Sequence, residues 1–167
     1  MNCYDNISNH FPGGLFKSVR KITLFDERPF EWDFFLKIAE AFPLIKEFSL
    51  SNRKAQNDKE CRNSKDNEDL PLIKYLHLHK LDLFDVHEDY LHLFLDHTKI
   101  FFPNSICLRV DYPELKRVTD HFTQDRMRIN CAKVIQLSVF GKLQISEDFK
   151  CYFPHVKPSR LFFWNKN

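Results

Sequence analysis

A short apolar phrase recurs along the chain and constrains the fold more than any other feature of the sequence. It reads FPLIKEFSL at 42–50, LPLIKYLHL at 70–78 and FPNSICLRV at 102–110. In the first two copies, apolar residues follow the proline at offsets of 2, 5 and 7. Offsets 5 and 7 alternate as in a β-strand, so their side chains share one face. The recurrence of this phrase therefore predicts several similar β-strands along the chain.

The same frame fits where no proline stands, from Lys17 and from Ala132, and a weaker sixth copy opens at Pro154. The anchors at 17, 43, 71, 103, 132 and 154 are 26, 28, 32, 29 and 22 residues apart. Most of these spacings suit a leucine-rich repeat with an L-x-x-L-x-L core. The apolar sets are Val19, Ile22 and Leu24; Ile45, Phe48 and Leu50; Ile73, Leu76 and Leu78; Ile106, Leu108 and Val110; Val134, Leu137 and Val139; and Val156 with Leu161.

Between the predicted strands the sequence has the spacing of helices. These segments are 29–42, with Pro29 at the first helical position, then 87–102, 112–122 and 146–153, with Ser146 as N-cap. We therefore expect an α/β fold: a leucine-rich-repeat-like solenoid of about five to six degenerate repeats, with parallel strands on one side and helices on the other. The alternative is an ordinary α/β sandwich whose strands resemble one another by coincidence.

The chain divides by composition into a polar N-terminal leader at 1–14 and a single repeat domain at 15–167. Segment 51–69 interrupts the domain with five basic and five acidic residues and only two apolar ones, Ala55 and Cys61. It has too little apolar surface to order itself, so we expect a mobile charged insertion. A recognition loop and a tolerated insertion are both consistent with that composition.

Charge and cysteine content exclude several classes of function. The chain carries 25 basic and 23 acidic residues and a net charge of +2, which predicts neither a nucleic-acid partner nor a membrane surface. Five widely spaced cysteines without a C-x-x-C pair favour a reducing compartment. Residues 1–11 lack the layout of a secretory signal. We expect an intracellular protein, in the cytoplasm and with the nucleus left open.

Histidines and cysteines are the candidate chemical groups. His77 and His79 alternate on one expected strand face, but zinc requires two further ligands at that point. We interpret them as polar surface residues, with zinc binding as the weaker alternative. Cys107 and Cys131 lack any motif that would pair them with a histidine and lower their pKa. The sequence therefore predicts no enzyme, no catalytic or metal-ligating residues and no cofactor.

In a repeat of this kind the parallel strands line a concave surface, which is the usual binding face. Offsets 4, 6 and 8 point toward it, and aromatic and arginine side chains dominate protein interfaces. We expect a patch centred on Tyr75, His77 and Arg109, unless these are merely residues that suit a strand surface. The candidate face comprises Phe25, Tyr75, His77, His79, Arg109, Asp111, Gln136 and Phe140.

Several longer segments resemble the C-terminal region of a large invertebrate family of F-box, leucine-rich-repeat-like proteins. The likeness covers roughly residues 12–155 and is carried by VRKITLFDERPFEWDFFLKIAEAFPLIKEFSLSN, EDYLHLFLDHTK, LKRVTDHFTQDRMRINCAKV and DFKCYFP. The resemblance implies a protein-binding module that recognises substrates for a cullin-type ubiquitin ligase, with ligase components among its partners. No F-box precedes residue 15. The alternative is a free-standing scaffold or interaction protein with no ligase role.

Overall fold

Seven strands form the main sheet of the computed structural model, which describes residues 2–57, 71–103 and 105–164. From one edge to the other the strands follow their order along the chain, and every neighbouring pair is parallel. The strands are β1 (Cys3–Ile7), β2 (Lys21–Phe25), β3 (Glu47–Asn52), β5 (Lys80–Val86), β7 (Ile106–Asp111), β8 (Val134–Phe140) and β9 (Leu161–Trp164).

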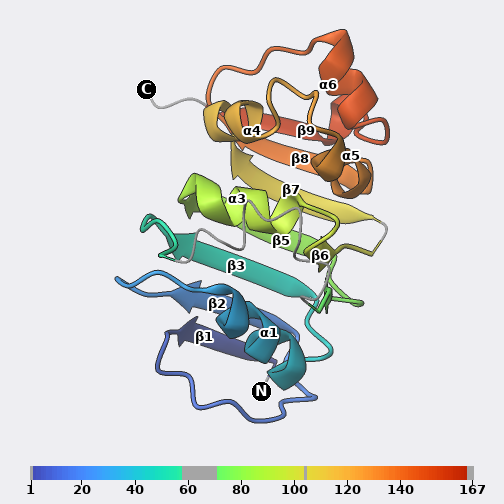
Figure 1. Cartoon of the computed structure of the whole chain (residues 1–167). Helices are drawn as coiled ribbons and strands as arrows, with labels where there is room; N and C mark the ends of the chain where they lie inside the picture. Colours follow the sequence, from blue (N-terminus) through green and yellow to red (C-terminus); the bar gives the residue numbers. More distant parts are fainter. Residues whose placement is uncertain (1, 58–70, 104, 165–167) are drawn as a thin grey trace.

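Helices occupy most of the connections between these strands. The helices are α1 (Trp32–Ala41), α3 (Glu88–Leu95), α4 (Tyr112–Val118), α5 (Asp125–Cys131), α6 (Glu147–Tyr152) and the 3₁₀ turn η1 (Pro158–Arg160). Figure 1 shows α1, α3, α4 and α5 together in front of the sheet. A mostly parallel sheet with intervening helices confirms the α/β class predicted from the sequence.

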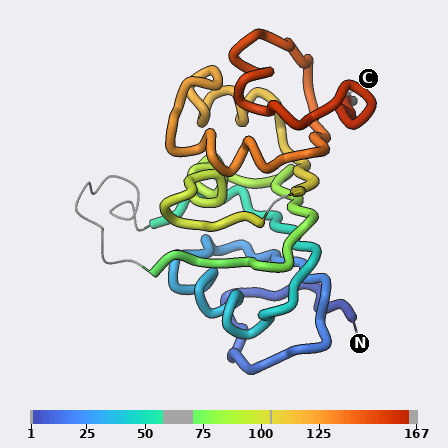
Figure 2. The backbone as a smooth tube through the Cα atoms, turned by 90° about the vertical axis from the view of Figure 1, so that its right-hand side faces the viewer, coloured from blue at the N-terminus to red at the C-terminus, as the bar shows by residue number. Residues whose placement is uncertain are grey.

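Two short strands, β4 (Ile73–Lys74) and β6 (Ile100–Phe101), make a separate parallel pair in which Ile73 lies opposite Ile100. Both isoleucines are buried. Figure 2 shows that the chain advances steadily, with the N-terminal strands at one end of the molecule and the C-terminal segments at the other. Neighbours in sequence are therefore neighbours in space.

The strands align in a common register that matches the repeat frame. Ile22 lies opposite Phe48, and Phe48 lies opposite Leu81. The row continues from Leu81 to Leu108, and from Leu108 to Leu137. These five side chains are at most 1 % exposed and face the helices. The sequence frame identified the member at offset 5 correctly in every copy of this row except the third.

In the third copy the predicted register is wrong by five residues. The strand of the main sheet is Lys80–Val86, whereas the frame counted from Pro71 placed it at 75–79. Leu76, expected in the core, is 58 % exposed, and Leu81 takes its place with no exposed surface. The frame failed because Ile73 belongs to the separate β4–β6 pair, which imitates the start of a repeat.

The N-terminal segment also differs from expectation. β1 lies within the predicted leader 1–14, yet it forms the edge of the main sheet beside β2. Ile7 and Phe11 anchor it in the core. Of the predicted insertion 51–69, residues 51 and 52 complete β3, and the buried Gln56 donates to the carbonyl of Phe30 at 2.8 Å. Residues 58–69 lie outside the described residues.

Helix boundaries follow local capping chemistry. The Ser146 side chain accepts a hydrogen bond from the backbone N–H of Phe149, which confirms the predicted N-cap of α6. Asp111 caps α4 in the same way through the N–H of Glu114. α1 begins at Trp32, so the prediction that Pro29 occupies the first helical position is wrong. α5, which ends at Cys131, lies outside the four helical segments given above; its Met127 and Cys131 are buried.

The register correction predicts opposite outcomes for two leucines of the third repeat. We expect Leu81→Ala to lower the free energy of unfolding by about 3 kcal/mol, because it leaves a cavity under the centre of the sheet. Leu76→Ala should change it by less than about 0.5 kcal/mol, because that side chain is exposed. Urea unfolding of both variants measures the difference. Equal losses would contradict the register described for β5.

Candidate functional site

One face of the main sheet presents its alternate residues away from the helices, and none of these residues is buried. We call this the outward face. It comprises Lys21, Thr23 and Phe25; Glu47, Ser49 and Ser51; Lys80, Asp82 and Phe84; Cys107, Arg109 and Asp111; and Gln136, Ser138 and Phe140. Because the strands are in register, these side chains also form rows across the sheet.

Arg109 occupies the centre of a cluster on the outward face. Its Nη1 donates to Oδ2 of Asp82 at 2.9 Å, across the β5–β7 pair. Its guanidinium carbon lies 4.8 Å from the centre of the Phe84 ring. Phe84 in turn meets Phe140 edge to face, with ring centres 5.3 Å apart. An arginine held by a carboxylate and by an aromatic ring that packs on a second ring is a preorganised group of the kind found at protein interfaces.

Five of the predicted site residues lie on the outward face: Phe25, Arg109, Asp111, Gln136 and Phe140. Phe25 is 54 % exposed at the end of β2. Arg109 and Phe140 contact the same ring, that of Phe84. Phe25 lies on a different strand pair from this cluster, opposite Ser51 of β3. The structure thus brings Arg109 and Phe140 together around Phe84, and Asp111 lies opposite Phe140 in the strand register.

Tyr75 does not belong to this face, so its predicted position is wrong. It is 3 % exposed, and its hydroxyl donates to the carbonyl of Phe35 at 3.1 Å. Its ring packs edge to face on Phe48 and is stacked parallel to Phe94. Complete burial raises the pKa of the Tyr75 hydroxyl far above its ordinary value. Tyr75 is a core residue on the helical side of the sheet.

His77 and His79 are exposed but are not strand residues. His77 lies in a turn before β5, and His79 is the last residue before that strand. The backbone of His79 joins the sheet, since its N–H donates to Lys46 and its carbonyl accepts from Cys107. The expected alternation on one strand face is therefore wrong for this pair. It follows from the same five-residue slip.

The sequence frame missed Asp82, Phe84 and Asp85, which β5 supplies to the outward face and its rim. The missed signal is the L-x-L spacing of Leu81 and Leu83, which repeats that of Phe48 and Leu50. It was hidden because the Pro71 phrase satisfied the same pattern earlier.

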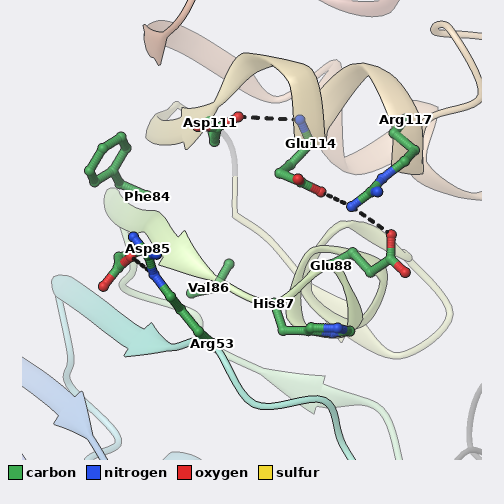
Figure 3. Close-up of a pocket in the computed structure, with 9 residues that line it drawn as sticks. All are labelled: Arg53, Phe84, Asp85, Val86, His87, Glu88, Asp111, Glu114 and Arg117. Carbon is green, nitrogen blue, oxygen red and sulfur yellow. Dashed lines mark hydrogen bonds and ion pairs between the residues drawn. The ribbon is translucent and has the colours of Figure 1, made fainter. Parts of the chain in front are cut away.

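A cavity of about 290 Å³ opens at the carboxyl ends of β5 and β7, where α3 and α4 begin. Figure 3 shows that charged side chains line it: Arg53, Asp85, His87, Glu88, Asp111, Glu114 and Arg117, with Phe84 and Val86. Arg117 binds Glu88 at 2.9 Å and also contacts Glu114. The carboxyl ends of strands are where open parallel sheets usually hold ligands.

A second cavity of about 380 Å³ adjoins the first along the same edge of the sheet. It is lined by Phe25, Asp26, Glu27, Ser51, Asn52, Arg53, Lys54 and Asp85. Arg53 and Asp85 line both cavities, and Nε of Arg53 lies 2.5 Å from Oδ1 of Asp85. This ion pair therefore lies between the two cavities. We call the two cavities together the rim groove, which follows the carboxyl ends of β2, β3, β5 and β7.

Two carboxylates in the rim groove have opposite electrostatic environments. Burial disfavours ionisation of Asp85, but hydrogen bonds from Arg53 and Ser51 outweigh it, so the pKa of Asp85 lies below its ordinary value. Burial raises the pKa of Asp111 and outweighs the hydrogen bond from the backbone N–H of Glu114 and the charge of Arg53, which lower it. Asp111 has no ion-pair partner within the described part of the chain. It is the less compensated charge.

The remaining candidate chemical groups are placed by local structure. His87, Glu88 and Asp89 gather within 4.8 Å and are the one such group among the described residues. They begin α3: the His87 ring accepts from the N–H of Asp89, and Asp89 accepts from the N–H of Gln56. Capping accounts for this arrangement, so it carries no metal site by itself. Cys131 is fully buried, which raises the pKa of its thiol far above its ordinary value.

Among the helices of the described residues, none combines the length and apolar character needed to cross a membrane. Comparison with protein-family models, with curated proteins and with solved structures finds no match to this chain.

The raised pKa of Asp111 predicts how its replacement changes stability with pH. The folded protein holds this proton more tightly than the unfolded chain, so ionisation costs folding free energy as pH rises through and above the ordinary value of 3.8. We expect Asp111→Asn, which keeps the N-cap, to be more stable than the parent chain at pH 7. The gain should disappear by about pH 3, below both pKa values.

Denaturant unfolding of the two chains at both pH values provides the measurement. A gain of equal size at pH 3 would show that the effect of Asp111→Asn does not come from ionisation.

Proposed function

We propose that the chain is a protein–protein interaction module that binds its partner through the outward face. The supporting observation is the Arg109 cluster: an arginine fixed by Asp82 and Phe84, with Phe140 beside them, on a sheet face without buried side chains. Preorganised arginine and aromatic side chains lose little conformational entropy on binding. Such a group suits a macromolecular surface better than a small substrate.

The proposed architecture is a degenerate leucine-rich-repeat-like solenoid. Two observations support it: the seven strands follow one another in chain order, and one apolar row runs in register from Ile22 to Leu137. Repeat proteins of this kind bind through the face lined by their strands. The outward face is that face, and helices lie on the other side of the sheet (Figure 1).

Substrate recognition for an F-box-type ubiquitin ligase is the specific role that we propose. It rests on the resemblance of residues 12–155 to the C-terminal region of F-box, leucine-rich-repeat-like proteins. The second candidate is a scaffold or interaction protein without a ligase role, and the same face would serve it. The two roles differ in whether ligase subunits accompany the chain in its native setting.

Arg109→Glu should strongly reduce partner capture if the outward face is the binding site. It breaks the bond to Asp82 and reverses the charge at the cluster centre, and we expect capture to fall by about tenfold or more. The matched control is Arg128→Glu on α5. Arg128 also has an aspartate partner, Asp125 at 3.6 Å, and also lies over an aromatic ring, Tyr152 at 5.9 Å.

The measurement is quantitative affinity capture from native cell extract, read by mass spectrometry, with circular dichroism to confirm that both variants fold. Loss with Arg109→Glu but not with Arg128→Glu supports the proposal. Ligase adaptor and cullin subunits in the captured set favour the ligase role, and their absence favours the scaffold. A captured set that is equal for the parent and both variants would refute the placement of the site.

A further inference from the structure

The outward face is electrically polarised along its strands. At the amino ends, one row places Lys21, Glu47 and Lys80 side by side, with Glu47 3.5 Å from Lys80. At the carboxyl ends, acidic residues outnumber basic ones. The rim groove is lined by six carboxylates and three basic side chains, a charge of −3 with histidine neutral, in a chain whose net charge is +2.

Each end of the rim groove also offers an aromatic wall. Phe25, 54 % exposed, stands at the β2 end, and Phe84 stands at the β5–β7 end. Aromatic faces attract cations, and they pack against the apolar stems of lysine and arginine. The combination of carboxylates and aromatic rings favours an organic cation over a hydrated metal ion, because the metal ion has no apolar stem to pack against the rings.

The groove already contains two guanidinium groups, each paired with carboxylates. The same pairing is what the groove would offer to a cationic side chain from a partner. Arg53 reaches Asp85 at 2.5 Å with its side chain 82 % exposed. Arg117 bridges Glu88 and Glu114 with its side chain 62 % exposed. Both therefore lie at the surface of the groove (Figure 3). Asp111 lines the same cavity, is half-buried and has no ion pair in the described part of the chain, so it remains available to a third cation.

We propose that the rim groove binds an extended protein segment rich in lysine and arginine, laid across the carboxyl ends of β2, β3, β5 and β7. This inference rests on the proposed function, since it names the chemistry of the partner that the outward face receives. Asp85 and Asp111 contact the cationic side chains, Phe25 and Phe84 pack on their stems, and Arg109 orients the adjoining part of the partner.

Selection of peptides against the whole chain tests the proposal, because such a selection does not require the partner to be identified first. The probe is a phage-displayed library of random peptides of about 12 residues. At ~3.3 Å per residue such a peptide is long enough to cross four strands spaced ~4.8 Å apart. Enriched peptides are synthesised, and their affinities are measured by fluorescence anisotropy at about 0.05 and 0.5 M salt.

Two paired variants carry the comparison. Asp85→Asn with Asp111→Asn removes two charges from the groove and replaces each carboxylate by an amide of the same shape. Asparagine can still act as the N-cap of α4. Asp125→Asn with Asp148→Asn removes the same charge from two exposed residues in the first turns of α5 and α6. Unfolding curves establish that each paired variant folds.

We expect the enriched peptides to be basic, and to bind the groove variant about three- to tenfold more weakly than the parent at low salt. The control variant should retain the parent affinity, and high salt should erase the difference. Neutral or acidic enriched peptides, or basic peptides that bind both paired variants equally, would overturn the proposal. So would a selection that enriches no peptide.

The same peptides separate this proposal from the function on which it rests. Peptides of any charge whose binding is lost with Arg109→Glu but is unaffected by the groove variant would leave the outward face as a binding site and remove the basic segment as its partner. Peptides that bind the parent, the groove variant and Arg109→Glu equally would contradict both proposals.

Discussion

The stacking of one apolar row across the parallel strands is the constraint on which the rest of the structure depends. Ile22, Phe48, Leu81, Leu108 and Leu137 lie side by side, and each is fully or almost fully buried. No single strand closes a core alone, because a strand with one apolar side must be covered both by its neighbours and by a helix. Burial of each such side chain contributes about 2 kcal/mol, and only a common register gives every strand that contribution. The same register leaves the alternate residues aligned on the outward face, where Asp82 meets Arg109 directly. The candidate site is thus a consequence of how the core is stacked.

The sequence predicts a strand of this fold correctly where the apolar spacing of the repeated phrase fits only one segment. The spacing of apolar residues located β2, β3, β7 and β8 and their buried sides, because a strand and its entrance impose the same spacing each time. It failed where a second segment satisfied the pattern. Ile73 and Leu78 are both buried, yet one belongs to the β4–β6 pair and the other precedes β5. β1 was missed for the opposite reason: at an edge, a mostly polar strand needs few apolar residues, and here Ile7 and the following Phe11 suffice.

The prediction of the candidate site was correct where the strands were placed correctly and wrong where they were not. Arg109 and Phe140 were correctly predicted on the outward face because their strands were placed correctly. Tyr75 was wrongly predicted there because the frame placed a strand at 75–79. The partner of Arg109 on β5 could not be found from a wrong register, although Asp82 and Phe84 follow the L-x-L spacing. The rim groove lay beyond any periodic argument. It is built from the ends of four strands and the residues that follow them, where Arg53 and Asp85 meet across 32 positions of sequence.

The acidity of the rim has two physical origins, and they have different meanings. In a parallel sheet with helical connections the carboxyl end of a strand leads to the start of a helix, where the helix dipole and the free N–H groups favour acidic residues. Asp111, Glu114 and Glu88 are explained in this way, since each caps or begins a helix. Stacking such units gathers their carboxylates at one edge, whatever the chain binds. Asp82 and Asp85 are different, because they lie within β5 and no helix begins there. Each holds an arginine, Arg109 or Arg53, on the exposed side of the sheet. Helix formation does not require those two ion pairs, and surface ion pairs add little to stability. The placement of Asp85 at the rim, and of Asp82 on the outward face, is therefore best explained by the surface that they organise.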